Sequence, residues 1–366
     1  MIDINFVLNN FYQIPPVDCD NLEKFISSHN SKRRYLFGRN KYSHILSEIF
    51  DIEAFVDDFA EPNTFWKGKP VINANFLPDD AIVVNCSMSI HPISVLKRLN
   101  SIKVSTILAY ADFCRYFLDK KVPLPDFVNQ SRKDIYDNLS KWKQTSELLS
   151  DSKSKKTLDD LIYYRITGNY SCMKSYSVRF KEQYFESFLN KHNLRIFVDC
   201  GGFDGDTTEE FCKRYPNYKK VYLFEPSSTN IAEAKKRLQG FRDIQFIPLG
   251  VSDQESKLRF NSEEGSASCV SDSGLYQISV TTLDKNISEK VSFIKMDLEG
   301  WELKALQGSI KHIEEDHPIL AISVYHHPSD FWRIPEFILN LRNDYQVFLR
   351  HYTEGWSESV MYFVPK

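Results

Sequence analysis

The feature that most constrains the fold is the stretch IFVDCGGFDGDTTEEF at residues 196–211, followed by VYLFEP at residues 221–226. A short apolar run ends on Asp199, turns through paired glycines and continues into a sequence typical of a helix. A second apolar run ends on Glu225. In a parallel sheet both acids would lie at the carboxyl edge, where open α/β sheets bind nucleotide-like ligands. The stretch therefore predicts an α/β fold with a ligand site at that edge.

The glycine spacing narrows the choice of ligand. Gly201, Gly202 and Gly205 carry no side chain, so we expect the backbone of the turn to approach a ligand closely. Asp206 is the predicted N-cap of the following helix, with Thr207 in its first turn. The pattern lacks the third glycine of the G-x-G-x-x-G fingerprint. The spacing therefore disfavours NAD.

The two carboxylates have different predicted roles. Glu225 can accept hydrogen bonds from both hydroxyls of a ribose. Asp199 can fix the turn, or reach a ligand's ammonium group directly or through water. Since NAD sites also place an acid on a ribose, the carboxylates alone do not identify the cofactor.

The overall composition excludes several classes of protein. The chain has 366 residues, enough for two domains, and 42% of them are hydrophobic. A net charge of -3 is unlike the basic footprint of a nucleic-acid-binding protein. No apolar run is long enough to span a membrane, and the N-terminal sequence does not resemble a secretion signal. Seven scattered cysteines without a C-x-x-C pair indicate reduced thiols in a cytoplasmic protein.

Three regions differ in their patterns. Residues 1–124 are predicted to form a small Rossmann-like α/β domain, because short apolar runs alternate there with amphipathic stretches. Residues 125–193 are predicted to be a helical linker with a solvated turn at 151–156, and its helices are a candidate surface for a homo-oligomer. Residues 194–366 alternate again and end in two strands with no helix between them, which predicts an antiparallel hairpin closing a mostly parallel sheet.

A second acidic segment, FIKMDLEGWELKALQG, occupies residues 293–308. Its strand ends on Asp297, and Glu299 follows, so both would lie at the same edge as the glycine turn. Paired carboxylates there suit proton abstraction or a hard cation such as Mg²⁺. For Glu302 a functional role and a simple preference for a helix N-terminus remain equal alternatives. His326, in SVYHHPSDFW, would emerge beside them and can take a proton near neutral pH.

The order and spacing of these motifs resemble the FkbM-type methyltransferases over residues 180–366. The matching segments include VDCGGFDGDTT, VYLFEPSSTN, IPLGVSD, FIKMDLEGWELKALQG and the closing YFVP. The resemblance implies the seven-stranded class I methyltransferase fold, S-adenosylmethionine as cofactor, and a hydroxyl of a sugar, nucleotide sugar or glycan as acceptor. The expected catalytic residues are Asp297, Glu299 and His326. The expected cofactor contacts are Asp199, Gly201, Gly202, Gly205, Asp206, Thr207, Glu225 and Asp253.

The N-terminal region leaves the function partly open. Its opening is similar to nucleotide-sugar-binding domains, with Gly38 in the first turn and Asp57 and Asp58 after the second strand. Arg39 and Lys41 replace further glycines, which favours a domain for assembly or substrate capture over an NAD site. An NAD-dependent oxidoreductase of a nucleotide sugar and a non-catalytic nucleotide-binding protein remain the alternatives.

Overall fold

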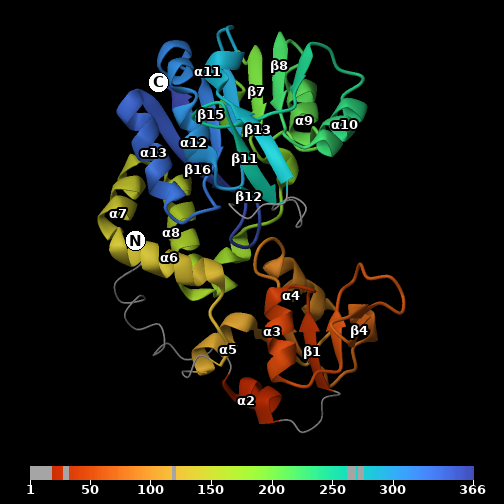
Figure 1. The fold of residues 1–366 in the computed structure, drawn as a ribbon. Coiled ribbons are helices and arrows are strands. Elements are labelled where there is room, and N and C mark those ends of the chain that lie inside the picture. Colours follow the sequence, from red (N-terminus) through yellow and green to blue (C-terminus); the bar gives the residue numbers. More distant parts are fainter. Residues whose placement is uncertain (1–18, 28–32, 118–120, 262–268, 271–275) are drawn as a thin grey trace. The chain divides into compact units, whose positions relative to one another are not determined.

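The computed structural model describes residues 19–27, 33–117, 121–261, 269–270 and 276–366 (Figure 1). The N-terminal segment judged not to be a secretion signal lies mostly outside them. The chain divides into two compact units, each described by itself. The first comprises Met1–Asn138, Leu158–Val178 and Tyr352–Ser357, and the second comprises Leu139–Thr157, Arg179–His351 and Glu358–Lys366. The domain boundaries expected after residues 124 and 193 stay a prediction.

The first unit contains a six-stranded sheet in the order β3-β4-β2-β1-β5-β6. Neighbouring strands are parallel, except that β3 and β4 are antiparallel. Apolar side chains fill the core beside it, as in strands that are covered by helices. Its strands are β1 (Arg34–Phe37), β2 (Ala54–Val56), β3 (Phe65–Trp66), β4 (Lys69–Ile72), β5 (Ile82–Asn85) and β6 (Thr106–Ala109). Its helices are α2 (Cys19–Ser27), α3 (Lys41–Ile49), α4 (Pro92–Ser101), α5 (Tyr110–Tyr116) and α6 (Asp126–Asp137), with a 3₁₀ turn at Ala74–Phe76.

The β3–β4 hairpin was not predicted. Lys67 and Gly68 join the two strands, with φ angles of 49° and 77°. Two residues with positive φ are typical of tight hairpin turns. The strands are too short to show an alternating pattern, so only the Lys-Gly pair signalled them.

Of the stretch 125–193 predicted to be helical, residues 126–167 are mostly helical and the remainder has only short 3₁₀ turns. After α6 come α7 (Leu139–Leu148) and α8 (Ser152–Thr167), followed by 3₁₀ turns at Tyr170–Ser175, Phe180–Glu182 and Ser187–Leu189. The predicted solvated turn at 151–156 is wrong. The Asp151 carboxylate accepts a hydrogen bond of 2.7 Å from the backbone N–H of Ser154, so the segment caps and begins α8.

The second unit contains a seven-stranded sheet in the order β16-β17-β15-β14-β7-β8-β9. The strands from β15 to β9 are parallel neighbours, and β17 pairs antiparallel with both β15 and β16. This confirms the predicted α/β class I methyltransferase fold and its closing hairpin. The strands are β7 (Ile196–Cys200), β8 (Lys220–Phe224), β9 (Ile244–Ile247), β14 (Phe293–Met296), β15 (Ile319–Ser323), β16 (Tyr345–His351) and β17 (Ser359–Pro365). The helices are α9 (Asp206–Arg214), α10 (Ser228–Arg237), α11 (Leu283–Asn286), α12 (Glu302–Gln307) and α13 (Asp330–Leu341), with a π-helical turn at His312–Asp316.

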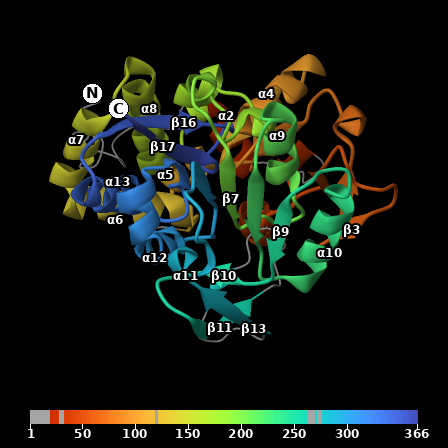
Figure 2. The same ribbon diagram turned by 90° about the horizontal axis from the view of Figure 1, so that it is seen from above.

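A smaller sheet in the order β10-β13-β11-β12 was not predicted (Figure 2). Its strands are β10 (Gly250–Val251), β11 (Ser256–Asn261), β12 (Cys269–Val270) and β13 (Tyr276–Thr281). Polar residues interrupt these strands, so the sequence shows no continuous apolar run there. Only the pairing of the strands in the structure identifies this sheet.

Two predictions about the whole chain can be compared with the described residues. No helix among them has both the length and the apolar character needed to cross a membrane. The six cysteines with described side chains form no disulfide.

Candidate functional site

The residues predicted to form the site follow four adjacent strands. The sheet order places β15, β14, β7 and β8 side by side. Asp199 lies in β7, and Glu225, Asp297 and His326 follow β8, β14 and β15. Parallel strands end at one edge of a sheet, so the fold brings these four residues to the same edge.

The glycine turn packs tightly against the protein itself. The backbone N–H groups of Gly201 and Gly202 both donate to the Phe224 carbonyl oxygen at 3.0 Å. A β-carbon on Gly201 would lie 2.0 Å from the Asp297 carbonyl oxygen, and one on Gly202 would lie 2.4 Å from the Leu223 side chain. Glycine is therefore required here by the close approach of β8 and β14.

The start of α9 corrects one prediction. Asp206 is the first residue of the helix and not its N-cap; Gly205 occupies the cap position with a φ of 84°. This left-handed conformation favours glycine, and a β-carbon there would lie 2.8 Å from Leu238. The Asp206 carboxylate accepts from the Thr207 N–H at 2.6 Å, and Asp206 is exposed.

Asp199 is fully buried in an ion pair. Its carboxylate lies 3.0 Å from the Lys295 ammonium and accepts a hydrogen bond of 2.8 Å from the Thr208 hydroxyl. Lys295 also donates to the Gly201 carbonyl oxygen at 2.7 Å. Of the two roles predicted for Asp199, this geometry favours fixing the turn.

The pKa shifts of this pair have opposing causes. Burial raises the pKa of Asp199, and Lys295 opposes that shift. Burial alone would lower the pKa of Lys295, but Asp199 and Asp297 raise it. The 3.0 Å separation and the donors around Asp199 favour the charged form of both groups.

The Glu225 carboxylate is oriented by the backbone. One oxygen accepts from the Ser227 N–H at 2.8 Å, and the other accepts from the Phe203 N–H at 3.1 Å. Burial raises the pKa of Glu225, and these hydrogen bonds oppose the shift. The Asn230 amide donates a further hydrogen bond of 3.4 Å to the oxygen that accepts from Ser227. Because a carboxylate has about four acceptor positions, the oxygen that accepts from Phe203 keeps capacity for a ribose hydroxyl. The residues present therefore fit the ribose of S-adenosylmethionine.

Phe203 joins this part of the site, which was not foreseen. Its φ is 44°, a strained conformation for a bulky residue, and 44% of its surface is exposed. Its backbone N–H holds Glu225, so the turn that orients the candidate ribose carboxylate also carries an exposed aromatic residue.

Asp253 is held by one side chain from α12 and by its neighbour in the chain. It forms an ion pair of 2.7 Å with Lys304 and accepts a hydrogen bond of 3.0 Å from the Ser252 hydroxyl. The hydrogen bond from Lys304 lowers the pKa of Asp253. Its predicted contact with the cofactor stays a prediction.

His326 lies among three carboxylates. Its Nδ1 is 3.0 Å from Glu302, and its Nε2 is 3.2 Å from Glu299 and 3.6 Å from Asp297. Glu302 also accepts the Leu298 N–H at 2.7 Å, so it holds both the loop after β14 and the imidazole. The structure thus brings the predicted catalytic residues together and adds Glu302 to them.

The carboxylates set the protonation state of this cluster. Burial alone would lower the pKa of His326, but Glu302, Glu299 and Asp297 raise it well above 6.5. Burial raises the pKa of Glu299, and His326 opposes that shift. His326 is therefore protonated near neutral pH, which disfavours the predicted role of a base in the ligand-free protein.

Tyr184 is a site residue that the sequence did not suggest. Its hydroxyl donates to Asp297 at 2.7 Å and lies 3.2 Å from the Ser323 hydroxyl. The Gln183 side-chain amide donates a hydrogen bond of 2.7 Å to Glu358. Burial and the Asp297 charge raise the pKa of Glu358 to about 7. No motif marked these residues, because they lie far from residue 297 in sequence.

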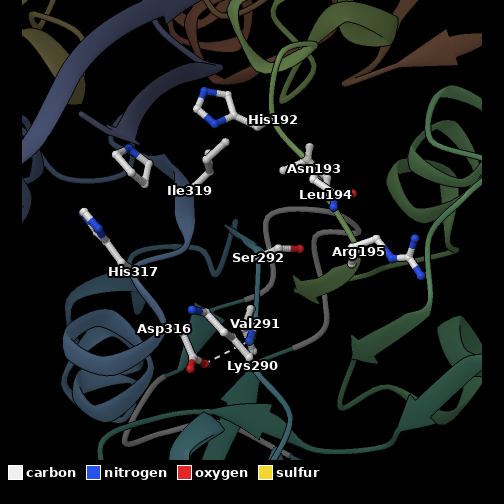
Figure 3. A pocket seen from close by; sticks show the side chains of 11 residues that line it. His192, Asn193, Leu194, Arg195, Lys290, Val291, Ser292, Asp316, His317 and Ile319 are labelled. Carbon is white, nitrogen blue, oxygen red and sulfur yellow. Dashed lines mark hydrogen bonds between the residues drawn. The ribbon is translucent and has the colours of Figure 1, made fainter.

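A pocket of about 330 Å³ lies at the opposite, amino-terminal edge of the seven-stranded sheet (Figure 3). Most of its lining residues precede β7, β14 or β15, the others are Ile319 at the start of β15 and Pro365 at the end of β17, and none of them is a predicted site residue. They include His192, Arg195, Lys290 and His317. Since parallel sheets bind ligands at the carboxyl edge, this pocket is separate from the candidate site.

In the first unit the predicted acids are paired with arginines. Asp57 lies 2.7 Å from Arg39, and Asp58 lies 2.8 Å from Arg98. Gly38 has a φ of 100°, as a tight turn requires. Because arginines already satisfy both carboxylates, this geometry does not favour an NAD ribose site there.

The second unit matches a known family, and a solved structure shares the fold of the chain. Residues 199–347 match the family described as "Methyltransferase FkbM domain". The crystal structure of methyltransferase FkbM from Methylobacillus flagellatus KT is similar over 99% of both chains, with a TM-score of 0.73 and 23% identity. An rRNA methylase structure from Streptococcus thermophilus is 18% identical over 49% of this chain and 92% of its own, with a TM-score of 0.33. A search of curated proteins found no match.

Proposed function

We propose that the protein is a methyltransferase that uses S-adenosylmethionine to methylate a hydroxyl group, because residues 199–347 match the family described as "Methyltransferase FkbM domain". The acceptor class we propose is a sugar, nucleotide sugar or glycan. The methyl carbon leaves the sulfonium sulfur and bonds to the acceptor oxygen, giving S-adenosylhomocysteine and a methyl ether.

The observation that carries this proposal is the position of Glu225 beside the glycine turn. Backbone N–H groups orient both of its oxygens, and it is 7% exposed. A preoriented, nearly buried carboxylate is suited to a ribose hydroxyl, because little ordering remains to be done on binding.

We propose that the cluster of residues after β14 and β15 binds the methyl acceptor. Holding the acceptor oxygen in line with the sulfonium methyl group would supply much of the rate acceleration. The hydroxyl proton must leave, and the groups at hand are Asp297 and Glu299. Glu299 is the better proton acceptor, because burial raises its pKa.

The test is binding of S-adenosylmethionine to the full chain, measured by calorimetry. We expect Glu225→Gln to weaken binding about tenfold or more, because a hydrogen bond to a charged group contributes about 1.5–3 kcal/mol. Glu210→Gln, which changes a partly exposed ion pair with Arg214, should leave the affinity unchanged. Wild-type affinity in Glu225→Gln, or no binding by the unmodified protein, would contradict the proposal.

A further inference from the structure

We propose that Asp297, Glu302 and His326 hold a divalent transition-metal ion. One potential ligand atom from each lies within 4.8 Å of those of the other two. The residues come from the ends of β14 and β15 and the first turn of α12, so the sheet fixes their spacing.

Two of these side chains are buried with unsatisfied atoms. The side chain of His326 is 9% exposed and that of Glu302 is 1% exposed. Among the described residues neither ring nitrogen of His326 makes a hydrogen bond of good geometry, although carboxylates lie 3.0 and 3.2 Å away. The Glu302 Oε2 atom has no hydrogen-bond partner there either. Buried polar atoms are nearly always satisfied, and one metal ion would bind the free Glu302 oxygen and one ring nitrogen of His326, from which it would displace a proton.

The charge of the cluster favours a cation. Asp297, Glu299 and Glu302 surround one imidazole. The nearby ammonium of Lys295 is already paired with Asp199 at 3.0 Å. Buried charges are costly unless they are paired or bind metals, and a divalent ion would balance the excess.

The donor set indicates which ions fit. Two carboxylates and an imidazole suit Mn²⁺, Fe²⁺ or Zn²⁺, whereas Mg²⁺ prefers oxygen ligands and keeps several waters. The inferred ion therefore differs from the Mg²⁺ predicted at Asp297 and Glu299, and Glu302 replaces Glu299 as a ligand.

Such an ion would act on the methyl acceptor. A metal at this edge can bind an acceptor hydroxyl and ease the loss of its proton. This consequence rests on the proposed function, but the site itself does not.

The experiment is a titration of the full chain, freed of metal by a chelator, with Mn²⁺ while electron paramagnetic resonance reports the free ion. We expect one ion per chain. Asp297→Asn, Glu302→Gln and His326→Gln should each lower the affinity about tenfold or more. Glu315→Gln, the loss of an exposed carboxylate, should not.

The outcomes separate the two proposals. The metal site is overturned if the unmodified protein does not bind Mn²⁺, or if all three ligand variants bind it with the affinity of the unmodified protein. If circular dichroism shows that Glu302→Gln does not fold, the Mn²⁺ affinity of Asp297→Asn decides the test, because this ligand is partly exposed. Glu225→Gln should bind Mn²⁺ normally, so a failure of the cofactor assignment leaves this test intact.

Discussion

Lys295 organises the candidate site without facing solvent. It is 3% exposed, pairs with Asp199 and donates to the Gly201 carbonyl oxygen. A lysine within the apolar run FIKM gave a signal of this role, because lysine is almost never fully buried unless it is paired. Sequence pattern alone could not identify the partner, since 96 residues separate the two side chains.

Replacing Lys295 with methionine should destabilise the protein strongly. The change leaves the Asp199 carboxylate buried without its cation, and breaking a buried pair in this way costs about 3–5 kcal/mol. Urea unfolding followed by circular dichroism measures the loss.

Two controls make that prediction specific. Lys213→Met breaks an exposed pair with Glu209 and should change stability by less than about 1 kcal/mol. The double variant Lys295→Met with Asp199→Asn removes both charges and should recover part of the loss. A single variant as stable as the wild type would mean that the pair contributes nothing.

At the scale of elements, the start of α8 depends on one carboxylate. Asp151 accepts from the Ser154 N–H at 2.7 Å and from Arg350 in β16 at 2.7 Å. Burial alone would raise the pKa of Asp151, but the hydrogen bonds from Arg350 and Ser154 lower it to about 2. The sequence around Asp151 predicts a polar turn, because the partner Arg350 lies far away in the sequence and its contact with Asp151 cannot be seen there.

This lowered pKa predicts how stability changes with pH. A carboxylate whose pKa falls on folding stabilises the protein above its unfolded value, here 3.8, and the contribution is lost as the pH falls toward about 2. The wild type should therefore exceed Asp151→Asn in unfolding midpoint at pH 5, and the gap should close toward pH 2. A constant gap across thermal melts at pH 2, 3, 4 and 5 would contradict this.

At the scale of the whole molecule, the family match ends before the sheet is complete. It covers residues 199–347, whereas β17 occupies Ser359–Pro365 and pairs with β15 and β16. The strand β17, which lies between β15 and β16 in the sheet, is thus the last strand in the sequence.

Ending the chain at residue 358 should prevent the second unit from folding. The deletion removes apolar side chains buried between β15 and β16 and leaves both strands without their backbone partners. The near-ultraviolet circular dichroism of the purified protein should lose the contribution of the aromatic residues buried in the second unit. Lys366→Ala, at the exposed last residue, should keep it; a native spectrum for the shortened chain would refute the prediction.

The sequence by itself determined the alternation of strands and helices, the acids at strand ends, and the edge of the sheet where Glu225, Asp297 and His326 meet. Those follow from local periodicity and from the rule that parallel strands end together. The tertiary structure alone decided the Asp199–Lys295 pair, the Tyr184 hydrogen bond to Asp297, the placing of Glu302 against His326 and the small β10–β13 sheet. Each of these depends on contacts between residues distant in sequence, which no local pattern encodes. The structure also shows that neighbouring strands crowd Gly201 and Gly202 and that the end of α10 crowds Gly205, while their contact with a ligand stays a prediction.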